Sequence, residues 1–215
     1  MKSKITDIRP QKKYSTRRSI FVNNEFLCGV DKEIVVILGL KVNQEVDKRK
    51  IKEILHKEEI KRAKDYTFKL LSYRLRSIKE IRNRLKKKDY SSKVILEVIK
   101  NLKRLKFLND KEFAKMWMEN RIRTRPMGRY RLKQELIQKG IDKNLVEKTL
   151  SNYREEEEIE LARELTQRKL RRSYRSLNRL TAQRRLYGFL QRRGFSYDII
   201  QEVMKELKGT ENEGK

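Results

Sequence analysis

Apolar residues along most of the chain recur at the three- and four-residue spacing of α-helices, and one such pattern occurs three times. The stretch 128–153 (GRYRLKQELIQKGIDKNLVEKTLSNY) has relatives at 77–102 and 181–207. Equivalent positions, offset by 51 and then 54 residues, are apolar in every copy: Ile81, Leu132 and Leu186; Leu85, Leu136 and Leu190; Tyr90, Ile141 and Phe195; Val94, Leu145 and Ile199; Ile99, Leu150 and Met204. A period of about 50 residues with a preserved pattern indicates a repeated supersecondary unit.

Each copy completes a three-helix module. A longer helix is predicted before each one, at 63–73, 110–123 and 156–170. A basic connector and two short helices follow. Ser91, Asp142 and Ser196 are the expected N-caps of the third helices, and Asp89, Gly140 and Gly194 are expected to end the second helices in a left-handed turn. Modules this small bury little surface alone, so we expect them to stack in series as an elongated, curved helical array.

Residues 1–60 have a different pattern and predict a small α+β domain. Strands are expected at 4–9, 18–22 and 26–28, with a tight turn at Asn23-Asn24 and a short return strand at 40–42. Asp31 is expected to cap a helix at 32–38 that ends at Gly39, and Asp47 to cap a second helix ending near Lys57, with Ile51, Ile54 and Leu55 on one face. The predicted organisation is 1–60, then modules at 61–107, 108–154 and 155–208, then a disordered tail at 209–215.

Charge narrows the choice of partner. The chain has 57 Lys+Arg and 30 Asp+Glu among 215 residues, a formal net charge of +27. Such an excess favours a polyanionic partner such as nucleic acid. Cys28 is the single cysteine, which excludes an internal disulfide and fits a cytoplasmic location, and the sequence has no apolar run long enough to cross a membrane.

The sequence contains few residues of the types that usually carry out catalysis. His56 is the single histidine, and the chain lacks a phosphate-binding glycine loop, a dinucleotide fingerprint and a Cys/His cluster with metal-ligand spacing. We therefore expect no enzyme activity, no cofactor and no metal. The aromatic residues Trp117, Tyr187, Phe189, Phe195 and Tyr197 are interpreted as core.

The positive charge is concentrated after the first helix of each module and on the second helix. Residues 74–88 hold eight basic residues and one acid, 121–139 hold seven and one, and 168–193 hold ten and none. If the modules share an orientation, the three patches form one stripe suited to phosphates. The candidate binding residues are Arg74, Arg76, Arg82, Arg84, Arg121, Arg123, Arg125, Arg129, Arg131, Lys133, Arg171, Arg172, Arg175, Arg179, Arg184, Arg185, Arg192 and Arg193.

These three units resemble the RecX family, most closely at FLNDKEFAKMWMENRIR (107–123) and RRGFSYDIIQEV (192–203), and ITDIRPQKK and SIFVNNEFLCGVD resemble the N-terminal extension of some members. The resemblance covers the chain from about residue 5 to 207. It implies a regulator of the RecA recombinase that lies in the groove of the RecA–single-stranded DNA filament and mostly inhibits ATP hydrolysis, strand exchange and filament growth. The charge pattern itself predicts contacts to the phosphates of single-stranded DNA, with weaker contacts to duplex DNA, and we expect the chain to act as a monomer. The resemblance supplies no catalytic residues.

Two other functions remain open from the residues alone. The second and third helices of each module could form a helix-turn-helix-like motif, which predicts an architectural or sequence-specific DNA-binding protein. The third helices mix acidic residues with few arginines, which suits packing better than groove reading. A ribosome- or RNA-associated basic protein is the weaker alternative.

Overall fold

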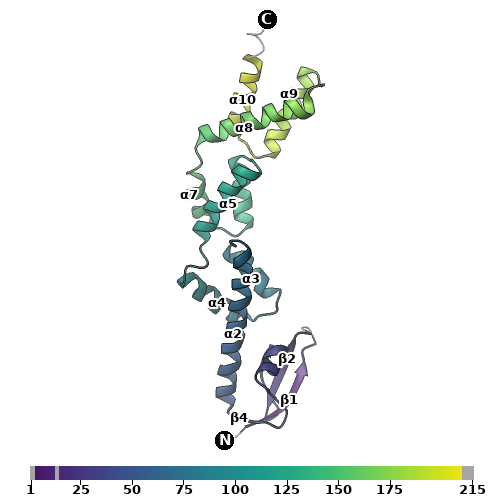
Figure 1. The fold of residues 1–215 in the computed structure, drawn as a ribbon, viewed down its shortest axis with the longest axis vertical. Helices are drawn as coiled ribbons and strands as arrows, with labels where there is room; N and C mark the ends of the chain where they lie inside the picture. The colour runs from purple at the N-terminus through teal and green to yellow at the C-terminus, as the bar shows by residue number, and fades with distance from the viewer. Residues whose placement is uncertain (1–2, 13–14, 210–215) are drawn as a thin grey trace. The chain divides into compact units, whose positions relative to one another are not determined.

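The computed structural model describes residues 3–12 and 15–209, so the predicted tail beyond Gly209 lies outside the described residues. The chain divides into two compact units, 1–108 and 109–215, and each is described by itself. The first unit contains β1 (Ser3–Pro10), β2 (Arg17–Val22), β3 (Glu25–Asp31), α1 (Lys32–Ile37), β4 (Glu45–Val46), α2 (Lys48–Tyr73), α3 (Ile78–Lys86) and α4 (Ser92–Arg104) (Figure 1).

An antiparallel sheet of order β3-β2-β1-β4 forms the N-terminal part, as the alternating pattern predicted. Asn23 and Asn24 both have positive φ, 51° and 66°, the conformation that a tight turn between β2 and β3 requires. The register pairs Ile5 with Val22, and both side chains are fully buried. Asp31 caps α1 by accepting a hydrogen bond from the Glu33 amide, which confirms the predicted helix start.

The return strand lies later than the sequence predicted. Residues 40–42 are not a strand: Leu40 packs into the core, and the chain then turns at Asn43, which has φ 69°. The Asn43 amide donates to the Ile5 carbonyl at 2.8 Å, and the two-residue strand β4 follows at once. The prediction of a strand at 40–42 was therefore wrong, and the return strand lies at Glu45–Val46, after the turn at Asn43.

Helix α2 is one continuous helix of 26 residues, whereas the sequence predicted a break near residue 60. Asp47 caps its start as predicted, and no glycine or proline interrupts it. Its buried positions are four residues apart: Ile51, Leu55, Glu59, Ala63 and Thr67. The first two belong to the core under the sheet and Ala63 belongs to the core of the first module, so this helix is shared by both cores. Ile54, expected on the buried face, is 46% exposed.

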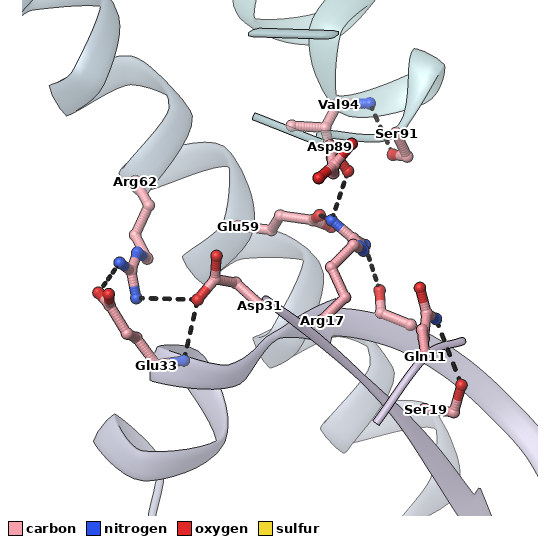
Figure 2. Close-up of polar contacts among 11 residues, drawn as sticks. Gln11, Arg17, Ser19, Asp31, Glu33, Glu59, Arg62, Asp89, Ser91 and Val94 are labelled. Atoms are coloured by element: carbon pink, nitrogen blue, oxygen red, sulfur yellow. Dashed lines mark hydrogen bonds and ion pairs between the residues drawn. The ribbon is translucent and has the colours of Figure 1, made fainter. Parts of the chain in front are cut away.

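A buried arginine joins the sheet to the first module (Figure 2). Arg17 on β2 is 7% exposed and donates to Glu59 on α2 at 2.8 Å. It also donates to the Asp89 carbonyl at 2.8 Å and to the Gly29 carbonyl at 2.6 Å. A buried charge is tolerated only when it is paired and hydrogen-bonded, and Arg17 meets both conditions. The sheet, α2 and the α3–α4 turn therefore meet at one side chain.

The second unit contains two more helical modules, with the bounds α5 (Asp110–Thr124), α6 (Arg129–Gln138), α7 (Lys143–Leu150), α8 (Glu155–Lys169), the π-helical segment η1 (Leu170–Tyr174), α9 (Arg179–Arg192) and α10 (Tyr197–Gly209). The repeat positions predicted as core on the second helix of each module are confirmed. Ile81, Leu132 and Leu186 are at most 1% exposed, and Leu85, Leu136 and Leu190 are fully buried. The π-helical segment was not predicted.

The turn between the second and third helices has the same construction in each module. Asp89, Gly140 and Gly194 have φ of 61°, 84° and 84°, which confirms the predicted left-handed residue. Ser91 and Asp142 accept amide hydrogen bonds as N-caps, and the Ser196 hydroxyl accepts one from the Ile199 amide. Local sequence signals were sufficient to predict these turns.

One aromatic residue interpreted as core, Tyr197, lies at the surface instead. Phe195 is buried and Tyr187 and Phe189 pack partly buried against the third module, but Tyr197 is 64% exposed. Tyr197 is the first residue of α10, and the buried residues of this helix begin two positions later, at Ile199.

Candidate nucleic-acid interface

The eighteen candidate cations fall into two groups according to their partners. Seven of them make hydrogen bonds or ion pairs with other parts of the chain through their side chains: Arg74, Arg76, Arg121, Arg129, Arg131, Lys133 and Arg193. Arg179 also makes an interaction. Spacing along the chain could not distinguish these residues from free ones, because many of their partners are distant in sequence.

In the second module, one carboxylate organises the end of α5. Glu135 on α6 accepts from the Trp117 indole at 3.0 Å and from Arg121 Nε at 2.7 Å. The Arg121 guanidinium lies 4.3 Å from the Trp117 ring centre, and the Lys139 ammonium lies 4.4 Å from it. Cations at such distances are attracted by the ring face. Arg121 is therefore a structural residue of the module, and Trp117 is only partly buried.

Arg129 at the start of α6 is tied to the first turn of α8. Its backbone amide donates to Glu158 at 2.7 Å, and its guanidinium donates to the Tyr153 carbonyl at 2.6 Å. Glu158 is 2% exposed, and this burial raises its carboxyl pKa even though Arg129 acts in the opposite direction. Glu158 is one of four consecutive glutamates at 155–158, so the sequence pattern does not single it out, and its inward-facing position is visible only in the structure.

The second and third modules meet at two glycines. The Gly128 amide donates to the Arg193 carbonyl at 2.9 Å, and the Tyr130 amide donates to the Gly194 carbonyl at 3.1 Å. A Cβ on Gly128 would lie 2.3 Å from the Gly194 carbonyl oxygen. The Arg131 guanidinium also donates to the Arg192 carbonyl at 2.9 Å. Glycine is required here because two backbones touch.

This junction brings the cations of two predicted patches together. Arg193 donates to the Pro126 carbonyl at 2.7 Å, so it spans both modules. Its pKa is lowered by burial, then by the positive charges of Arg131 and Arg125. Mutual repulsion of this kind marks a locally positive potential, and such a potential attracts an anion.

The first patch is divided in the same way. Arg74 forms a forked ion pair with Glu80, at 3.0 and 3.1 Å. Arg76 donates to the Leu70 carbonyl at 3.0 Å and so satisfies the C-terminal end of α2, and burial lowers its pKa. These two arginines position the connector between α2 and α3.

The remaining ten candidates are exposed, and within residues 3–12 and 15–209 their side chains make no hydrogen bond or ion pair. They are Arg82 and Arg84 in the first module, Arg123 and Arg125 in the second, and Arg171, Arg172, Arg175, Arg184, Arg185 and Arg192 in the third. Arginine presents a planar fork that matches phosphate or carboxylate geometry. The surface available for an outside partner is therefore this set of ten, which we call the free arginines, and the third module carries most of it.

The metal-binding and nucleophilic residue types named in the sequence have the following surroundings in the described part of the chain. No cluster of three or more His, Cys, Asp or Glu side chains able to hold a metal occurs among the described residues. Burial raises the pKa of the Cys28 thiol to about 11, so little thiolate exists near neutral pH. His56 pairs with Glu97 at 3.0 Å on the surface between α2 and α4. No described helix is both long enough and apolar enough to cross a membrane.

Comparison with known proteins matches four family models along the chain. These are the regulatory protein RecX N-terminal domain at residues 3–47 and the first, second and third three-helix domains of RecX at 63–102, 109–150 and 155–204.

Relatives match over nearly the whole chain. The regulatory protein RecX of Bacillus subtilis is 35% identical over 95% of this chain and 77% of its own length. That of Clostridium botulinum strain Alaska E43 is 30% identical over 97% of this chain and 98% of its own. Among solved structures, RecX from Lactobacillus salivarius has a TM-score of 0.64 and 30% identity over 70% of this chain and 97% of that one. A crystal structure of a regulatory protein RecX has a TM-score of 0.68 at 24% identity over 94% of this chain and 99% of that one, which shows the shared fold.

Proposed function

The chain belongs to the RecX family of regulatory proteins, and from that premise we propose that it regulates the RecA recombinase by binding the RecA–single-stranded DNA filament. The observation that carries the proposal is the set of ten free arginines. These side chains are exposed, have no hydrogen-bond or ion-pair partner within the described chain and occur in all three modules. The proposed effect is mostly inhibitory: less ATP hydrolysis, less strand exchange and slower filament growth.

The chemistry of a nucleoprotein filament suits these arginines. A filament presents DNA phosphates and acidic protein side chains, and guanidinium groups bind both through forked contacts. At the junction of the second and third modules, the pKa of Arg193 is lowered first by burial and then by repulsion from the positive charges of Arg131 and Arg125. A bound anion would relieve that repulsion, so this junction is the part of the surface that we expect to contact phosphate first.

The experiment adds the purified chain to RecA filaments on single-stranded DNA and follows ATP turnover and joint-molecule formation. We expect both to fall at stoichiometric amounts in low salt, and the effect to weaken steeply as salt rises, because each phosphate contact releases counterions. No effect on either reaction at low salt would rule out the proposal. Equal binding to duplex DNA without recombinase would favour an architectural DNA-binding protein.

Matched variants separate the free arginines from charge in general. The double variant Arg123→Ala/Arg125→Ala removes two free arginines of the second module. The control Lys100→Ala/Lys103→Ala removes two exposed lysines of α4 and so changes the net charge equally. We expect the arginine variant to lose inhibition and the lysine variant to retain it. Equal losses would mean that net charge alone, and not this surface, is responsible.

A further inference from the structure

The third module contains a cavity of about 670 Å³ to which the proposed function assigns no role. It lies among η1, the turn that follows it, α9 and the C-terminal part of α10. Leu170, Leu177, Leu186 and Leu207 provide an aliphatic floor, and Arg171 and Arg175 lie at the exposed edge. The volume is within the range of about 300–1,000 Å³ typical of ligand sites.

The lining is apolar and positively charged at the same time. None of the described residues that line the cavity is an aspartate or a glutamate. Arg171 and Arg175 are exposed and have no partner among the described residues, whereas the leucines are buried or half-buried. An occupant that matches this lining needs a bulky apolar group and negative charge beside it.

We propose that this cavity binds an apolar side chain from an acidic segment of a partner protein, with the flanking carboxylates on Arg171 and Arg175. This inference rests on the proposed function, in which the partner is a protomer of the recombinase filament. Interfaces are commonly anchored by one apolar side chain in such a pocket, with charged groups at the rim.

A nucleotide fits the same cavity less well. Single-stranded nucleic acid is held by stacking of bases on aromatic faces. The floor here is aliphatic, and Tyr174, the one aromatic residue of the described lining, already has the Lys169 ammonium 5.4 Å from its ring centre. The chemistry of the floor therefore favours a protein side chain over a base.

The first test fills the cavity without changing charge. Ala182 lines the cavity from α9, and Ala182→Met would occupy part of the space. Binding is measured to recombinase filaments on a fluorescent oligothymidine, and separately to the same oligonucleotide without recombinase. We expect filament affinity to fall about tenfold or more, the loss typical of a blocked anchor, with less than about a twofold change on free DNA. Equal losses of affinity for the filament and for the free oligonucleotide would indicate that a nucleotide occupies the cavity. An unchanged affinity for both would overturn the proposal.

A second pair of variants does not depend on the core. Arg171 and Arg172 are adjacent exposed arginines, but only Arg171 lines the cavity. Arg171→Ala is expected to weaken filament binding more than Arg172→Ala does. The two variants are expected to lose the same amount of affinity for free DNA. Equal losses on the filament would overturn the proposal.

A photocrosslinking side chain, p-benzoylphenylalanine, in place of the exposed Arg172, which is next to the cavity residue Arg171 but does not line the cavity, then identifies what lies at the cavity in the reconstituted filament. The expected product joins this chain to the recombinase. A product with DNA instead overturns the proposal while leaving filament regulation intact. Absence of any filament binding by the wild-type chain would overturn the proposed function itself, so the two failures are distinguishable.

Discussion

Gly128→Ala is the substitution that the junction between the second and third modules should tolerate least. Its Cβ would lie 2.3 Å from the Gly194 carbonyl oxygen, 2.4 Å from its carbon and 2.4 Å from the Phe195 nitrogen. All three atoms belong to backbone, so no side chain can rotate away. The two segments must therefore move apart to restore a normal contact.

The cost follows from what that separation breaks. The amide bonds from Gly128 to Arg193 (2.9 Å) and from Tyr130 to Gly194 (3.1 Å) both cross the contact. Each is worth about 0.5–1.5 kcal/mol, and forcing atoms into a packed site costs about 1–3 kcal/mol more. We therefore expect Gly128→Ala to lower the free energy of unfolding of the second unit by at least about 2 kcal/mol.

Urea unfolding followed by tryptophan fluorescence measures this directly, because Trp117 is the single tryptophan and lies in the second unit. The matched control is Gly188→Ala in the middle of α9. Its Cβ would meet only the flexible end of Arg192, at 3.1 Å. There we expect a gain of about 0.5–1 kcal/mol, since alanine is the better helix former. A Gly128→Ala midpoint equal to wild type would refute the reasoning, as would a larger loss at Gly188.

Other consequences follow from single side chains. Arg17→Met should lower the free energy of unfolding by about 3–5 kcal/mol by leaving the buried Glu59 unpaired, as measured by a urea melt followed by circular dichroism; an unchanged melt would contradict the buried pair. Burial raises the Cys28 pKa to about 11 from the ordinary thiol value of 9.0. Iodoacetamide should therefore alkylate the folded chain at pH 8 about a hundredfold more slowly than the unfolded chain, and the rate for the folded chain should rise about tenfold per pH unit up to about pH 10. Equal rates for the folded and unfolded chains would contradict the burial of Cys28. Glu135→Ala should shift the Trp117 emission to the red by releasing the indole to water; an unshifted spectrum would show that this carboxylate does not hold it.

Much of the fold could be predicted because its signals are local. The repeat core, the helix caps and the left-handed turns each depend on residues a few positions apart, and the spacing of those residues was enough to predict them. The continuity of α2 was missed for a physical reason. Its buried face passes through Glu59, Ala63 and Thr67, which carry little apolar signal, so the helix looked interrupted near residue 60.

The interface was less predictable, because the state of each arginine depends on residues distant in sequence. Arg121 and Arg129 looked equivalent to Arg123 and Arg125 in the sequence, yet the first two are held by acidic partners 14 and 29 residues away. Charge reversal at Arg121 or Arg129 would therefore test stability and binding together. Only the free arginines give a clean test of the surface.

The same turn serves as a docking point in both units. In the first, the carbonyl of the left-handed residue Asp89 accepts from Arg17 of the sheet. In the second, the carbonyl of Gly194, at the equivalent position, accepts from Tyr130 of the preceding module. At this carbonyl, the N-terminal sheet makes on the first module the kind of contact that the second module makes on the third. Terminal repeats need such a cap, because no neighbour covers their outer face. The shared helix α2 and the buried Arg17–Glu59 pair fix this cap in place, so we interpret residues 3–47 as a structural part of the first module and not as an independently moving domain.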